Sequence, residues 1–105
     1  MNLKDKIEFS VFSSTEEGIS IKITEKVQQG SLLEMYITAS KKTSIIIQII
    51  DTDGEQVQKL TCITTKEFKC ESFWSTPKDA IPGIYTVKVF DTTASAEATF
   101  QIIKK

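Results

Sequence analysis

The sequence predicts an all-β protein, an antiparallel β-sandwich of seven or eight short strands. Three observations carry this prediction. Apolar and polar residues alternate with a period of two in short runs, and clusters of turn residues separate the runs. No stretch shows the 3.6-residue period of an amphipathic helix. At 105 residues the chain is long enough to bury one core, so we expect a single domain over residues 1–105.

The first half of the chain contains four expected strands, at residues 7–12, 19–24, 33–39 and 44–50. In the second of these, isoleucines alternate with polar residues, as expected of a strand with one buried face. The fourth is apolar on both faces except at Gln48, which predicts a central strand of its sheet.

The second half contains four more, at residues 57–63, 68–74, 83–91 and 94–103. A turn with glycine at position 54 precedes the first of them. Small alanines alternate along the last strand, which favours close approach of a facing sheet. We therefore expect a sandwich, with a small closed barrel as the alternative.

The two cysteines lie on neighbouring expected strands. A hairpin centred on Lys66 places Cys62 opposite Cys70. If the two residues form a non-hydrogen-bonded pair, their Cβ atoms come close enough for a disulfide. This register favours a disulfide, the alternative being two thiols in the core. A disulfide implies an oxidising compartment. The same face carries Leu60 and Phe68, so we expect both to point inward.

Aromatic residues fall into two groups. Three are expected to anchor the core: Trp74, Tyr85 and Phe100. Four others lie on strand faces opposite the main apolar rows: Phe12, Tyr36, Phe73 and Phe90. The second group forms either an exposed binding patch or a cover for a sheet edge or neighbouring domain.

Composition argues against several classes of function. Histidine is absent, which removes Ser-His and Cys-His nucleophilic pairs and the commonest metal ligand. We expect no enzyme, no cofactor and no metal. The turn from Asp51 to Glu55 is similar to the start of a calcium loop but lacks the remaining ligands, so a hairpin turn is expected. A net charge of −1 argues against nucleic acid, and no apolar run is long enough to cross a membrane.

The second half of the chain resembles a known group of domains. The resemblance rests on Asp51 to Val57, Phe68 to Trp74, the loop and strand PKDAIPGIYTVKVFD, and the closing strand ASAEATFQI. In this order they are similar to macroglobulin-like and immunoglobulin-like sandwich domains of large surface proteins, including archaeal surface-layer and biofilm-associated adhesins. The match covers roughly residues 27–103 and implies a single immunoglobulin-like domain at the cell surface. A cysteine pair eight residues apart is not expected to join two sheets, and no thioester-forming Cys-Gln motif is present.

These observations predict a non-catalytic structural or adhesive module of a secreted or cell-surface protein. Its partners would be protein, either neighbouring domains in a tandem array or further copies of itself. The alternative is a stand-alone binding domain for carbohydrate or for a protease. The export signal would lie outside this chain; a cytosolic protein is the other possibility. Lys41, Lys42 and Lys88 are candidate guards of exposed strand edges.

Overall fold

The computed structural model describes residues 9–13 and 18–105, and side chains from residue 18 onward. This part of the chain contains nine strands and no helix. The strands are β1 (Phe9–Ser13), β2 (Ile19–Thr24), β3 (Lys26–Gln28), β4 (Leu32–Ala39), β5 (Ser44–Ile50), β6 (Gln56–Ile63), β7 (Lys69–Ser75), β8 (Gly83–Phe90) and β9 (Ser95–Ile103). Consequently, no described helix is long and apolar enough to span a bilayer.

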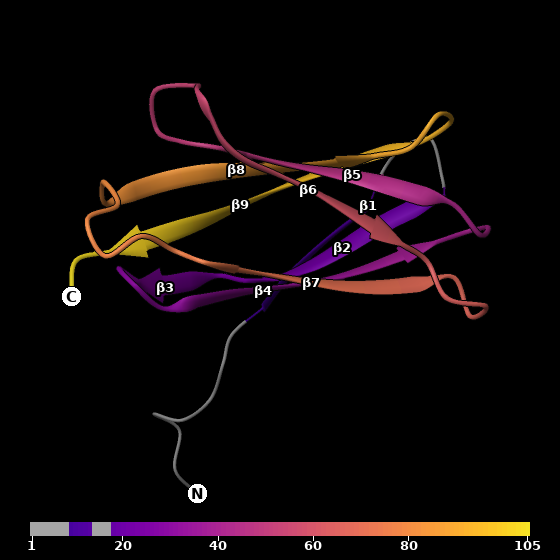
Figure 1. The fold of residues 1–105 in the computed structure, drawn as a ribbon, viewed down its shortest axis with the longest axis horizontal. Coiled ribbons are helices and arrows are strands. Elements are labelled where there is room, and N and C mark those ends of the chain that lie inside the picture. The colour runs from indigo at the N-terminus through magenta and orange to yellow at the C-terminus, as the bar shows by residue number, and fades with distance from the viewer. Residues whose placement is uncertain (1–8, 14–17) are drawn as a thin grey trace, which may run out of the picture.

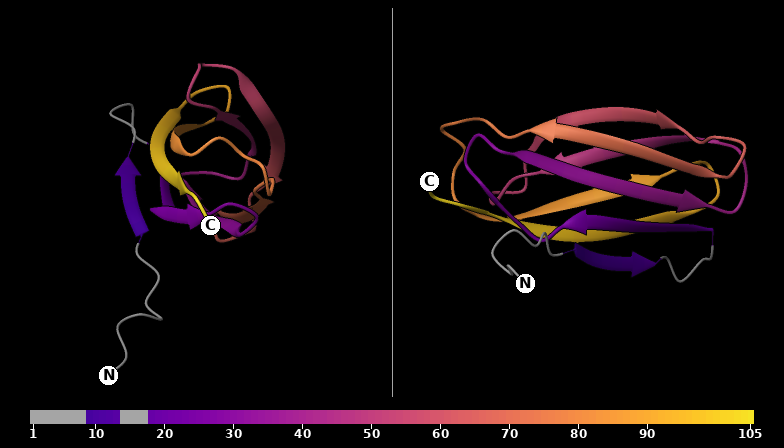
Figure 2. Two further views of the ribbon diagram at one scale, coloured as in Figure 1. Left: turned by 90° about the vertical axis from the view of Figure 1, so that its left-hand side faces the viewer. Right: turned by 90° about the horizontal axis from the view of Figure 1, so that it is seen from below.

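The strands form two sheets that pack face to face (Figure 1). One sheet has the order β1-β2-β4-β7 and the other the order β3-β9-β8-β5-β6. Figure 2 shows the two layers end-on and from below. All pairings are antiparallel except that of β3 with β9, which is parallel. The all-β fold expected from the sequence is therefore confirmed, and the described strands form two sheets rather than one closed sheet.

Period-two alternation builds the core. In β4, Leu33, Met35 and Ile37 are buried while Glu34 and Tyr36 on the other face are only half-buried. The other long strands β2, β5, β8 and β9 contribute similar rows, and the two inner faces meet in a single apolar cluster. Full burial of a Leu or Ile side chain contributes about 2 kcal/mol. Three threonines are the buried polar residues of the described part, and each is hydrogen-bonded: Thr24, Thr64 and Thr76.

The number of strands differs from the expectation. The structure has nine described strands rather than seven or eight, because the short β3 pairs with β9, the last strand of the chain. A three-residue strand shows too little alternation to be found in a sequence. The central position of β5 is confirmed, since it lies between β6 and β8.

Candidate functional site

The chain passes from one sheet to the other within the turn between β6 and β7. Thr64, at the start of the turn, is held by the five-stranded sheet: its backbone N–H donates to the Thr43 carbonyl at 3.0 Å. The Thr43 N–H donates in turn to the Thr64 hydroxyl at 2.8 Å. Phe68, at the end of the turn, belongs to the other sheet, since its carbonyl accepts the N–H of Ala39 at 2.8 Å. The two strands therefore diverge directly after the turn.

This divergence corrects the expected hairpin. β6 pairs with β5, and β7 pairs with β4, so Cys62 and Cys70 do not face each other within one sheet. The disulfide itself is present, with a Cα–Cα distance of 6.1 Å. It joins the edge strands of the two sheets. The expectation that a pair eight residues apart cannot join two sheets is wrong, because the turn spans both layers.

Phe68 has an unusual backbone conformation. Its φ of 66° lies in the left-handed region, where a bulky side chain is strained. The Phe68 N–H donates to the Thr65 carbonyl at 2.9 Å, and the Thr65 N–H donates to the Lys69 carbonyl at 2.8 Å. A left-handed residue between these two bonds brings the Lys69 carbonyl back to Thr65 and closes the turn. The ring is 40% exposed. The prediction that Phe68 points inward is wrong because the residue belongs to the turn, not to the strand.

A cleft lies beside the disulfide, between the edges of β6 and β7. Its volume is about 520 Å³, and Cys62 and Cys70 line it together with Thr61, Ile63 and Lys69. Neither strand has a described partner on its outer edge. Their exposed backbone groups are thus available to another strand.

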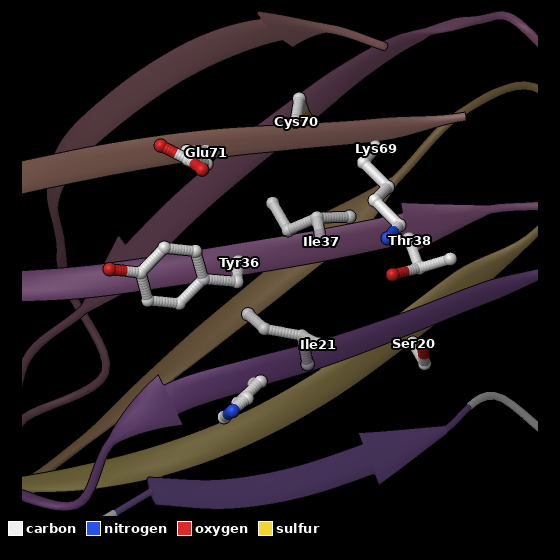
Figure 3. Close-up of a pocket in the computed structure, with 9 residues that line it drawn as sticks. Ser20, Ile21, Tyr36, Ile37, Thr38, Lys69, Cys70 and Glu71 are labelled. Atoms are coloured by element: carbon white, nitrogen blue, oxygen red, sulfur yellow. The ribbon is translucent and has the colours of Figure 1, made fainter. Parts of the chain in front are cut away.

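A second hollow, of about 460 Å³, lies on the outer face of β2, β4 and β7 (Figure 3). Strand register sets two rows across this face. Lys22 lies opposite Tyr36, which lies opposite Glu71. The next row consists of Ser20, Thr38 and Lys69. The hollow therefore combines one aromatic ring with charges of both signs and two hydroxyls.

The Tyr36 hydroxyl donates to Oε1 of Glu34 at 2.6 Å. This hydrogen bond, with smaller contributions from burial and from the charges of Glu34 and Glu71, raises the pKa of Tyr36. The phenol therefore stays protonated at neutral pH and can act as a hydrogen-bond donor. It is not poised for proton transfer near neutral pH.

The three predicted core anchors are all buried. Trp74 lies in β7, and Tyr85 and Phe100 lie on β8 and β9 with ring centroids 5.4 Å apart. The Tyr85 hydroxyl donates to the Ile81 carbonyl at 2.8 Å. Burial, reinforced by the nearby Asp51, raises the pKa of Tyr85. This placement assigns the anchors to the core rather than to a site.

The four outer aromatic residues do not form one patch. Tyr36 and Phe73 are neighbours on the four-stranded sheet, in an edge-to-face contact with centroids 6.2 Å apart. Phe90 lies in β8 of the other sheet, opposite Ile46. Phe12 lies in β1, whose side chains are outside the described residues. Among the residues with described side chains, the pair on β4 and β7 is thus the candidate aromatic surface.

The Asp51 turn is organised by its own backbone. Oδ1 of Asp51 accepts the N–H groups of Asp53 at 2.8 Å and Glu55 at 2.9 Å. Asp91 makes a similar turn before β9, accepting the N–H groups of Thr93 and Ala94. Among the residues with described side chains, no three His, Cys, Asp or Glu residues gather as metal ligands would. Both aspartates thus have a turn-forming role in this structure.

The remaining predicted residues lie away from both hollows. Lys88 is in β8, an internal strand, so the prediction that it guards an edge is wrong. Lys41 and Lys42 lie in the loop between β4 and β5. Sequence reasoning missed the grouping of Ser20, Thr38 and Lys69, because it depends on the pairing of β2, β4 and β7. No local signal in the sequence gives that pairing.

Comparison with known proteins identifies no family. No family model matches the chain, and no curated protein matches it either. Solved structures do match, at the level of fold. The CARDB domain of a Pyrococcus furiosus protein, solved in complex with di-metal ions, aligns with a TM-score of 0.51 and 12% identity, over 98% of both chains.

Two further structures align similarly. An uncharacterized Bacillus anthracis protein has a TM-score of 0.53 and 17% identity, over 77% of both chains. An engineered protein has a TM-score of 0.53 and 12% identity; the alignment covers 81% of this chain but only 20% of the engineered one. At these identities the likenesses concern the fold alone. They support an immunoglobulin-like β fold.

Proposed function

We propose that this chain is a non-catalytic module of a protein exposed to an oxidising extracellular environment, and that it makes contacts with other protein. The proposal is carried by the side of the sandwich where β6 and β7 lie. Both edges are open there, and the disulfide ties them together. Four of the seven exposed large apolar residues of the described part lie on β6, β7 or their turn: Val57, Ile63, Phe68 and Phe73. Such a combination suits contact with protein.

The amino-acid composition supports the non-catalytic part of the proposal. The 105 residues include no histidine. The resemblance to domains of surface proteins supports a structural or adhesive role in an array or assembly. The disulfide supports an extracellular location, since disulfides persist in oxidising compartments.

A thermal-shift screen against sugars, calcium and nucleotides tests the proposal. We expect no shift in the unfolding midpoint, because a module built for protein contacts gives small ligands no enclosed site. A ligand that raises the midpoint by several degrees at submillimolar concentration contradicts it and favours a binding domain. Intact mass of protein secreted through an oxidising compartment tests the location; free thiols would contradict it.

Carbohydrate binding is the second candidate, and the hollow in Figure 3 favours it. Tyr36 lies on the central strand of the three, with Glu71 on one neighbouring strand and Ser20 on the other. An aromatic ring beside hydroxyl and carboxylate groups can stack against a sugar and bind its hydroxyls. The volume falls within the range of small-ligand sites.

Affinity electrophoresis in gels containing polysaccharides tests this candidate. Retardation that Tyr36→Ala abolishes would support it. Phe90→Ala is the matched control, since Phe90 is a half-buried aromatic residue on the other sheet. Equal mobility in all gels would rule this candidate out for the polysaccharides used.

A further inference from the structure

We propose that β6 is a self-association edge: two copies of the chain pair β6 with β6, antiparallel, about a two-fold axis at Leu60. The two five-stranded sheets would then form one continuous sheet across the dimer. This inference rests on the proposed function and specifies a second copy of this chain as the partner.

Hydrogen bonds define which backbone groups of β6 are free. Thr64 N–H points toward β5, because it donates to the Thr43 carbonyl. Along a strand, backbone groups point alternately to either side. Leu60 and Cys62 therefore bond to β5, whereas Lys59, Thr61 and Ile63 direct their N–H and C=O groups to the outer edge. There the Lys59 N–H donates to Oε1 of the neighbouring Gln58 at 3.0 Å, a side chain that a pairing strand would displace. The outer edge of β6 from Lys59 to Ile63 thus offers backbone groups that no other described strand uses.

β6 also extends beyond the cover of the opposite sheet. Its core-facing residues Gln58 and Leu60 are only half-buried, although the next one, Cys62, is buried. Four residues on its outer face are exposed: Val57, Lys59, Thr61 and Ile63. Edge strands are usually protected by charges, proline or bulges. In β6 the bulge, opposite Ile49 and Ile50, lies at the start of the strand, so Lys59 is the one protective feature between Gln58 and Ile63.

The sequence of β6 is self-complementary in one register. With the axis at Leu60, Lys59 of each copy lies opposite Thr61 of the other. Ile63, 72% exposed, then reaches the bulge of the other copy, where Val57 is 44% exposed, so an apolar contact forms at each end of the pairing. Moving the axis to Lys59 would oppose the two lysines. Moving it to Thr61 would place Val57 opposite Thr65, which lies beyond the end of β6.

Leu60 gains most from this register. Since the outer-edge bonds come from the odd-numbered residues, the two Leu60 residues form a non-hydrogen-bonded pair with Cα atoms about 4.5 Å apart. Each half-buried leucine would cover the other on the core side of the sheet. This contact would bury the part of the Leu60 side chain that the opposite sheet leaves exposed.

The edge of β7 is a poorer site for a second copy. The Sγ atom of Cys62 lies 3.5 Å from the carbonyl oxygen of Glu71, and so obstructs the middle of that edge. An antiparallel pair of β7 strands centred on Glu71 would also oppose two carboxylates. Of the two strand edges that border the cleft, the edge of β6 is therefore the more accessible to a second copy.

Sedimentation velocity over a concentration series tests the inference. We expect reversible dimerisation of the wild-type protein. Thr61→Lys places a lysine opposite Lys59 at two symmetric positions and should weaken the dimer by about tenfold or more. Thr99→Lys is the matched control, an exposed threonine of β9 in the same sheet, and should leave the dimer unchanged.

The double variant Lys59→Glu, Thr61→Lys tests the register. It places opposite charges in both pairs and should restore dimerisation. A wild-type protein that stays monomeric, or a Thr61→Lys variant that dimerises as well as wild type, overturns the inference. Failure of the double variant to recover overturns the register. None of these results bears on small-ligand binding, so failure here is distinguishable from failure of the proposed function.

Discussion

At the scale of single residues, the turns of this sandwich depend on a few side chains with unusual backbone or hydrogen-bond requirements. Phe68 adopts a left-handed conformation that glycine or asparagine usually occupies. Asp91 uses one carboxylate oxygen to accept the N–H groups of Thr93 at 2.7 Å and Ala94 at 2.8 Å. Each of these features gives a prediction for stability.

For Phe68, the informative comparison is between two variants that both remove the ring. Phe68→Gly should be more stable than Phe68→Ala by about 1 kcal/mol, because a left-handed conformation costs alanine about that much and glycine almost nothing. In an ordinary strand alanine would be the better residue. Urea unfolding of both variants measures the difference, and equal stability would contradict the strained turn.

For Asp91, stability should depend on pH. Burial alone would raise its pKa, but the hydrogen bonds from Thr93 and Ala94 outweigh burial and lower the pKa of the carboxyl below its usual value. A lowered folded-state pKa stabilises the protein above the unfolded-state pKa, and this contribution disappears as pH falls through the folded-state pKa. Asp91→Asn should therefore cost about 1 kcal/mol at pH 7, and less as pH falls below the usual pKa of an aspartate, about 3.9.

Urea unfolding of wild type and Asp91→Asn between neutral and acidic pH checks this expectation. Asp53→Asn, at an exposed position in the other turn, is the control and should have little effect. A cost of Asp91→Asn that is the same at all pH values would contradict the role of the charge.

At the scale of elements, the disulfide replaces the pairing that β6 and β7 lack. The sequence predicted both strands and their bond but placed them in one sheet. The local sequence suggested a hairpin, because Cys62 and Cys70 are equally far from Lys66 and would face each other across a turn centred there. The hydrogen bonds that separate the strands come from Thr43 and Ala39, which are distant in sequence. Such non-local pairing is not visible in the pattern of one segment.

Removing the disulfide should destabilise the fold without abolishing it. The chain-entropy model gives about 2.6 kcal/mol for a ring of this size. The double variant Cys62→Ala, Cys70→Ala should lose about this amount in urea unfolding and keep its β-type circular dichroism. An unchanged free energy of unfolding would mean that the bond does not constrain the chain.

Gly83 fixes the start of β8 against the turn before β6. Its φ is +145°, and an added Cβ would lie 2.7 Å from Cγ2 of Thr52. Gly83→Ala should cost about 2 kcal/mol, from the backbone conformation and the overlap together. Adding Thr52→Ser removes the methyl group and should recover part of the loss. No recovery in a double-mutant cycle would contradict the contact.

At the scale of the whole molecule, alternation in the sequence was enough to predict two packed sheets and most of the core. Long strands such as β4 and β9 follow directly from their period-two rows. The candidate sites were harder to predict. The hollow over β2, β4 and β7 and the open edge of β6 both depend on strand order, which a single sequence does not contain.

Amide hydrogen exchange measured by NMR at several protein concentrations tests directly whether the edge of β6 is open and pairs with a second copy. At low concentration the amides of Lys59, Thr61 and Ile63 should exchange quickly, while those of Leu60 and Cys62 are protected by β5. As the concentration rises, the first three should become protected. Protection of all five amides at every concentration, or fast exchange of the first three even at the highest concentration, would contradict the account.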